Sequence, residues 1–199
     1  MKVTDNYQKY THKNPFQRIL LNNFFKALSQ ILRPLRVETI LDVGCGEGFI
    51  LAKLKQEKIG KKLIGIDLSK AALRIGKNIH PKLTLKLGSI YKLPFKDNAF
   101  DLVLCTEVLE HLKNPPKALA EIIRVSGRYI FLSVPNEPFF IAANLIRGKN
   151  VWRLGNDIGH INHWTSGGFE EFILKQGLKK LVKKHPFPWT IILAEKLKR

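Results

Sequence analysis

The sequence is poor in cysteine, in long apolar runs and in acidic residues. Its 199 residues include only two cysteines, Cys45 and Cys105, which lie far apart among apolar residues. This spacing does not fit a disulfide framework and indicates a reducing compartment, so we expect a cytoplasmic protein. No apolar stretch approaches the roughly 18 residues that suggest a membrane span, and the polar N-terminal stretch differs from a signal peptide. We therefore expect neither a transmembrane segment nor a signal peptide.

The shortage of acidic residues leaves a large positive charge. Asp and Glu number 16 against 34 Lys and Arg, so the formal net charge is +18. Residues 51–92 alone carry 11 basic and 2 acidic residues. A clustered basic face would bind a polyanion such as RNA, whereas scattered lysines only cover solvated helix and strand faces. Most basic residues are lysines between apolar positions, so we favour the solvated surface and keep nucleic acid as the alternative partner.

Apolar residues make up 45% of the chain and no long polar tract interrupts them, which predicts one folded domain over residues 1–199. Within it we expect an N-terminal helical cap (1–36), a core (37–135) and a lid or substrate segment with the last strands (136–199). The expected strands are 38–43, 62–67, 83–87, 100–105, 128–134 and 189–197. The expected helices are 16–33, 49–58, 69–79, 108–112, 114–125 and 169–176. This alternation indicates an α/β fold with a mostly parallel sheet.

A glycine-rich turn between an expected strand and an expected helix is the strongest functional signal. Gly44, Gly46 and Gly48 permit a sharp turn and let a ligand lie against the backbone. Phe49 stands where a dinucleotide site has its third glycine, and Asp42 would be a poor neighbour for a pyrophosphate. The turn therefore disfavours a nicotinamide-dependent oxidoreductase and suits a cationic ligand.

Asp67 ends the second expected strand, 19 residues after Gly48. A carboxylate at that place accepts hydrogen bonds from both hydroxyls of a ribose. The alternative, a helix cap only, is disfavoured by the glycine turn upstream.

Four segments together carry a family resemblance. They are ILDVGCGEG (40–48), IGIDLS (64–69), LGSIYKLPF (87–95) and FDLVLCTEVLEH (100–111). The chain resembles the class I S-adenosylmethionine-dependent methyltransferases, with the matches in order from Ile40 to about Val134. Two later segments, SVPN (133–136) and GHINHW (159–164), are similar to one branch of small methyltransferases. The resemblance implies a Rossmann-like fold with about seven strands, mostly parallel, helices on both faces and an antiparallel last strand.

The resemblance also implies S-adenosyl-L-methionine as the cofactor. It assigns the glycine turn to the methionine part, Asp67 to the ribose, and Leu68 and the Ile90 amide to the adenine. Ser89 departs from the pattern, because many family members have an acidic residue there. With Asp42 added for its charge, the expected cofactor residues are Asp42, Gly44, Cys45, Gly46, Asp67, Leu68, Ser89, Ile90, Cys105 and Thr106.

The candidate general bases are His160 and His163, three residues apart in an irregular segment, with His111 and Glu107 near the fourth expected strand. Two histidines at this spacing also suit a metal ion, but the sequence offers no third ligand, so we expect no metal. A third interpretation is that His160 and Trp164 order a lid by hydrogen bonding and packing.

The expected activity is methyl transfer to an oxygen, nitrogen or carbon nucleophile. Because no separate RNA-binding module is present, we favour a small-molecule or lipid-like acceptor. The expected apolar lining of its pocket is Phe139, Phe140, Ile141, Trp152 and Trp164. Residues near the first helix also face the cofactor in this family, and Tyr7, Tyr10, His12 and Arg18 are the candidates, Arg18 more as a solvated residue. The alternatives are an RNA-directed methyltransferase, an RNA-binding protein and a non-catalytic subunit.

Overall fold

A seven-stranded β-sheet forms the centre of the computed structural model, which describes residues 4–11, 14–146, 152 and 159–197. The strand order is β3-β2-β1-β4-β5-β7-β6, and β7 runs antiparallel to both of its neighbours while the other pairs are parallel. The expected architecture is therefore confirmed. The strands are β1 (Thr39–Val43), β2 (Lys62–Asp67), β3 (Thr84–Leu87), β4 (Phe100–Thr106), β5 (Ser126–Pro135), β6 (Leu178–Lys184) and β7 (Trp189–Lys196).

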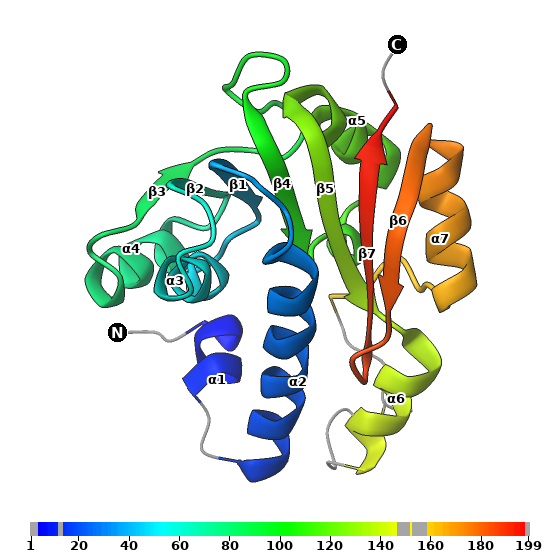
Figure 1. The fold of residues 1–199 in the computed structure, drawn as a ribbon. Coiled ribbons are helices and arrows are strands. Elements are labelled where there is room, and N and C mark those ends of the chain that lie inside the picture. The colour runs from blue at the N-terminus through cyan, green and yellow to red at the C-terminus, as the bar shows by residue number, and fades with distance from the viewer. Residues whose placement is uncertain (1–3, 12–13, 147–151, 153–158, 198–199) are drawn as a thin grey trace.

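Helices cover both faces of this sheet (Figure 1). The helices α2, α3 and α4 lie on one face, and α5 and α7 lie on the other. The helices are α1 (Asp5–Thr11), α2 (Pro15–Leu32), α3 (Phe49–Gln56), α4 (Lys70–Ile79), the 3-10 helix η1 (Leu109–His111), α5 (Pro115–Val125), α6 (Glu137–Ile146) and α7 (Ser166–Lys175).

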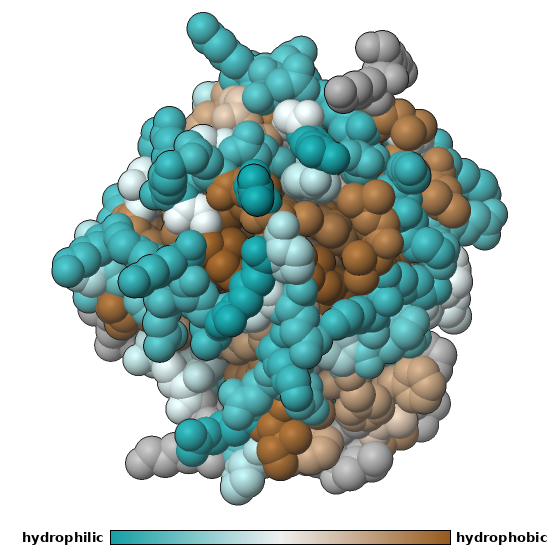
Figure 2. All heavy atoms as spheres, viewed as in Figure 1, coloured by the Kyte–Doolittle hydropathy of each residue, from teal (hydrophilic) through white to brown (hydrophobic). Residues whose placement is uncertain are grey.

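Both faces of the central strands are buried, as a parallel sheet requires. On β1, Ile40 packs in the cluster under α2 and α3, and Leu41 packs in the cluster under α5 and α7. Both side chains are 0% exposed. Figure 2, in the same view, shows apolar side chains between α2 and the C-terminal strands and hydrophilic side chains over much of the rest of this face.

Side-chain caps set several helix starts where the sequence predicts them. The Ser69 hydroxyl accepts a hydrogen bond from the Ala72 amide at 3.1 Å, and the Asn114 side chain accepts one from the Lys117 amide at 3.1 Å. Pro115 follows in the first turn of α5, where the missing amide costs nothing. These caps confirm the expected boundaries of α4 and α5.

Several elements differ from the prediction. The strand β6 has no counterpart among the expected strands, because its LKKLVKK sequence lacks strict alternation and its register with β7 shifts between Lys180 and Val182. The helix α6 was also not predicted. The expected helix at 108–112 is only the three-residue 3-10 helix η1, and β5 begins at Ser126, before the strand start expected at residue 128.

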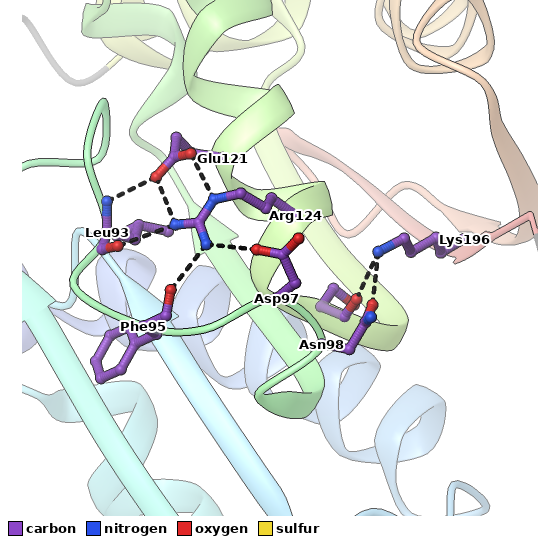
Figure 3. Close-up of polar contacts among 8 residues, drawn as sticks. Leu93, Phe95, Asp97, Asn98, Glu121, Arg124 and Lys196 are labelled. Atoms are coloured by element: carbon purple, nitrogen blue, oxygen red, sulfur yellow. Dashed lines mark hydrogen bonds and ion pairs between the residues drawn. The ribbon is translucent and has the colours of Figure 1, made fainter.

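The guanidinium of Arg124 on α5 fastens the connection between β3 and β4 (Figure 3). It donates to both carboxylate oxygens of Glu121 and, at 2.9 Å, to Asp97. It also donates to the backbone oxygens of Leu93 at 3.0 Å and Phe95 at 2.8 Å. The guanidinium of this one residue therefore stabilises a connection that has few backbone hydrogen bonds of its own.

No helix within the described ranges is both long and apolar enough to cross a membrane. Most of the irregular segment expected at 148–168 lies outside the described residues.

Candidate active site

A cavity of about 1360 Å³ lies at the carboxyl ends of β1, β2 and β4, where ligands bind in open α/β sheets. It exceeds the roughly 300–1,000 Å³ of a typical small-molecule site, so it has room for two ligands. Every expected cofactor residue except Cys105 lines it. The short helix α1 lies beside these strand ends in Figure 1 and contributes to the wall.

The glycine turn after β1 exposes its backbone to this cavity. The Gly44 and Cys45 amides donate to the Ile66 carbonyl at 2.8 and 3.1 Å, which ties the turn to β2. Gly44, Gly46 and Gly48 all have positive φ, with 78° at Gly44. A Cβ atom at Gly44 would lie 2.3 Å from Val108 Cγ2, so only glycine fits.

Asp42 is a buried carboxylate without a hydrogen-bond partner in the described part of the chain. Its side chain lines the cavity and the residue is 1% exposed. Burial, with a smaller contribution from the charge of Asp67, raises the pKa of Asp42 to about 7. A cationic ligand group next to it would offset the cost of this buried charge.

Asp67, at the end of β2, is fixed by two backbone amides. One oxygen accepts from the Gly46 amide at 2.8 Å, and the other accepts from the Ser69 amide at 2.7 Å. The carboxylate is therefore oriented at the cavity wall and tied to the glycine turn. Leu68 follows on the wall with 75% of its surface exposed.

Ser89 and Ile90 form the wall beyond β3. The Ser89 hydroxyl accepts a hydrogen bond from the Tyr91 amide at 3.3 Å. The serine that replaces the usual acidic residue is thus engaged with its own loop.

The N-terminal helix α1 is attached to the site by polar contacts that the sequence did not predict. Thr4 and Asn6 donate to the buried Glu47 carboxylate, and Lys9 pairs with Glu107. No short motif links these partners, because about 40 to 100 residues separate them.

Of the N-terminal residues expected near the cofactor, Tyr10 lines the cavity and stacks on Phe49 with ring centroids 4.5 Å apart. Burial raises the pKa of Tyr10 well above its usual value. Arg18 is exposed and is not part of the lining, in line with the solvated role. His12 lies outside the described residues.

The opposite end of the cavity is lined by Thr106, His111 and His160. Nδ1 of His160 lies 2.9 Å from Oε1 of Glu137, and both side chains are buried. Glu137 opens the unpredicted helix α6, and nothing in its local sequence singles it out.

Two of the other predicted site residues, His163 and Cys105, lie outside the cavity lining, whereas Glu107 is part of it. His163 is 46% exposed, lies outside the lining, and places its Nδ1 3.5 Å from the same Glu137 oxygen. Cys105 is 0% exposed and points into the core, because it alternates with Thr106 along β4. The side chain of Cys105 therefore does not face the cavity, contrary to its expected role as a cofactor residue.

The expected apolar pocket is realised only in part. Phe140 lines the cavity, whereas Phe139 is 54% exposed and Trp152 is fully exposed. Trp164 packs on the aromatic rings of α7, with ring centroids 5.5 Å from Phe169. Ile141 is half-buried and is not among the lining residues. The apolar wall instead includes Pro188 and Trp189.

Comparisons with known proteins identify a family for the region that contains the glycine turn and Asp67. A family described as "Methyltransferase domain" matches residues 41–130. Over these residues the chain carries a methyltransferase domain of the class I S-adenosylmethionine-dependent type. A demethylmenaquinone methyltransferase of Symbiobacterium thermophilum is 36% identical over 110 residues, which is 50% of this chain and 43% of that protein. A ubiquinone biosynthesis O-methyltransferase of Albidiferax ferrireducens is 32% identical over 155 residues, covering 67% and 60% of the two chains.

The chain spans about half the length of the curated relatives that it matches. Among solved structures, the magnesium protoporphyrin IX methyltransferase of Synechocystis with bound S-adenosylhomocysteine has a TM-score of 0.72. The similarity covers 98% of this chain and 95% of that one at 14% identity, so it shows the fold alone.

S-adenosylmethionine is the cofactor of this class of methyltransferase domain, and the residues present fit it. The unpaired Asp42 suits the cationic amino group, the backbone of the glycine turn lines the cavity, and Asp67 is oriented for ribose hydroxyls.

Proposed function

We propose that the chain transfers a methyl group from S-adenosylmethionine to an oxygen, nitrogen or carbon nucleophile of a small or lipid-like acceptor. The single observation that carries this proposal is one cavity lined by Asp42, Asp67 and the glycine turn at one end and by His160 at the other. When bound, the cofactor supplies a methyl group on a sulfonium sulfur, which is already a good electrophile. The chain has then to hold the acceptor in line and to assist loss of its proton where the nucleophile carries one.

We assign the contact with the acceptor's nucleophile to His160. Glu137 holds Nδ1 of this ring, so the other nitrogen, Nε2, points away from Glu137. His163 contacts the same carboxylate from an exposed position, which supports a role in positioning Glu137. Thr106 lines the wall near these residues and is the neighbouring polar group at the end of β4.

For the acceptor we propose an apolar molecule with a phenolic or quinol ring. Phe140, Pro188 and Trp189 give the cavity an apolar wall beside its polar groups, as small-molecule sites require. Two relatives that are named for methylation of demethylmenaquinone and for ubiquinone biosynthesis support the same acceptor class.

A transfer assay with labelled S-adenosylmethionine tests the proposal. The acceptors are a short-chain quinol, a simple catechol and a short RNA. We expect label in the ring compounds, and we expect His160→Ala to lower kcat by about 10²–10⁴-fold with unchanged affinity for S-adenosylhomocysteine. His163→Ala is the matched control and should lose far less. Label in the RNA alone, or equal losses in both variants, would refute the assignment.

A further inference from the structure

Two histidines and a glutamate meet at the acceptor end of the cavity. One ligand atom from each of Glu110, His111 and His160 lies within 4.8 Å of the others. We infer that these three side chains bind a divalent ion of the zinc, cobalt or iron type, for which imidazole and carboxylate are suitable ligands.

The first argument is the state of Glu110. The residue is 1% exposed, and neither carboxylate oxygen has a hydrogen-bond partner among the residues that the structure describes. A buried carboxylate without a partner is costly, and such groups are typically paired or bind a metal. The two imidazoles of the cluster are the ligand-bearing groups next to it.

The second argument is how the two rings are held. Nδ1 of His111 lies 2.7 Å from the Gly159 carbonyl oxygen, and Nδ1 of His160 lies 2.9 Å from Oε1 of Glu137. Histidines that bind metal almost always donate their other ring N–H to a carbonyl or carboxylate in this way. The arrangement leaves Nε2 of both rings to bind the ion.

The third argument is that the two segments are fastened together before any ion binds. The Ile161 and Asn162 amides donate to the Glu110 carbonyl at 2.9 and 3.0 Å. The Asn162 side chain donates to the Leu112 carbonyl at 2.7 Å. Two ligands at about 2.1 Å from an ion lie at most about 4.2 Å apart, so small side-chain rotations close the site.

The inferred ligand set differs from the histidine pair that the sequence suggested. That pair was His160 with His163, whereas the structure brings His160 together with His111 and supplies Glu110 as the third ligand. Three protein ligands leave a coordination position open, as in catalytic sites. His111 and His160 line the cavity, so this position faces the proposed acceptor.

The consequence for catalysis, unlike ion binding itself, rests on the proposed methyl transfer. An acceptor oxygen bound to the ion loses its proton to solvent water at a lower pH, because the cation stabilises the oxyanion. When the ion is bound, His160 acts on the acceptor through the ion, as one of its ligands, and not by direct contact.

Metal titration of tag-free, chelator-treated protein tests the site. We expect Co²⁺ and Zn²⁺ to bind one to one by calorimetry and Co²⁺ to give a visible absorption band. Glu110→Gln and His111→Ala should each weaken binding at least about 100-fold, and Glu137→Gln by about 10–100-fold. His185→Ala, which changes an exposed histidine bonded to Ser166, should change nothing.

Absence of binding by the wild-type protein, or unchanged affinity in Glu110→Gln and His111→Ala, would overturn the inference. His111 is exposed, so its variant keeps the test valid even if Glu110→Gln fails to fold. The same preparations are titrated with S-adenosylhomocysteine. Protein that binds the nucleoside and no ion refutes the metal site alone, and protein that binds the ion and no nucleoside refutes the proposed methyl transfer alone.

Discussion

At the level of single residues, the buried carboxylate of Asp42 couples the proposed cofactor contact to the stability of the fold. Burial raises its pKa to about 7, well above the unfolded value of 3.8. The folded protein therefore binds more protons than the unfolded chain between these two values. Stability contributed by the protonated form is full below about pH 4 and is lost as the pH rises towards 7. The ionised carboxylate, which is the form proposed to contact the ligand, therefore destabilises the ligand-free protein.

Replacing this carboxylate should stabilise the cofactor-free protein at alkaline pH. We expect Asp42→Asn to raise the free energy of unfolding at pH 8 by roughly 2–4 kcal/mol, and by much less at pH 4. Urea unfolding at both pH values measures this. Glu38→Gln, which changes a largely exposed carboxylate, is the control and should show a much smaller difference. Equal effects of Asp42→Asn at the two pH values would contradict the assigned pKa.

The same residue should make cofactor binding depend on pH. Protonation of Asp42 below about pH 7 removes its attraction for an ammonium group, so wild-type protein should bind S-adenosylhomocysteine about tenfold more weakly at pH 6 than at pH 8. The Asp42→Asn variant should bind more weakly throughout and lose this difference. Calorimetric titration at the two pH values decides, and a wild-type affinity that does not change with pH would exclude Asp42 as the ammonium contact.

At the level of elements, Arg124 replaces regular structure in the β3–β4 connection. Its guanidinium donates hydrogen bonds to Glu121, Asp97 and two backbone carbonyls. The single ammonium group of a lysine cannot reach all of these acceptors at once. We expect Arg124→Ala to lower the free energy of unfolding by about 2–3 kcal/mol, or roughly 4–10 °C in Tm. Arg124→Lys should recover less than half. Thermal unfolding followed by circular dichroism measures the stability of both variants. A loss under 0.5 kcal/mol in Arg124→Ala would show that Arg124 does not stabilise this connection.

Elements with local signals could be predicted from the sequence. The strand-turn-helix around Gly44 carries its own conformational constraint, and Ser69 and Asn114 mark helix starts by capping. The strand β6 could not be predicted from the sequence. Its lysines lie on an exposed edge of the sheet, and its strand conformation depends on pairing with β7. The helix α6 begins two residues after the end of β5, and the start signal in its sequence, Asn136 followed by Pro138, was not used in the prediction.

At the level of the whole molecule, the fold assembles a site that sequence spacing alone does not reveal. The cofactor end follows one motif from Asp42 to Gly46 plus Asp67, which explains why it could be predicted. The acceptor end depends on pairs far apart in the chain, such as Glu137 with His160, 23 residues later. The packing of η1 against residues 159–162 and the hydrogen bond from the Glu137 amide to the Trp164 carbonyl bring these groups together.

The net charge of +18 is also a property of the whole surface. Several lysines pair with acidic neighbours, as Lys180 and Lys183 do with Glu170, and the excess is spread over many elements. We expect only weak, non-specific binding of a single-stranded oligonucleotide, lost between 50 and 200 mM salt. Fluorescence anisotropy over this salt range measures it. Tight binding that persists at 200 mM salt would favour the RNA-directed alternative.

The most direct test of the account is calorimetric titration of the purified protein with S-adenosylmethionine, S-adenosylhomocysteine and NADH. It is repeated on Asp67→Ala and on the control Glu171→Ala, which changes an exposed carboxylate on α7. The account predicts that both sulfur nucleosides bind, that NADH does not, and that Asp67→Ala alone weakens binding by about tenfold or more. Folded, ligand-free protein that binds none of the three, or binds the nucleosides equally well without Asp67, would contradict it.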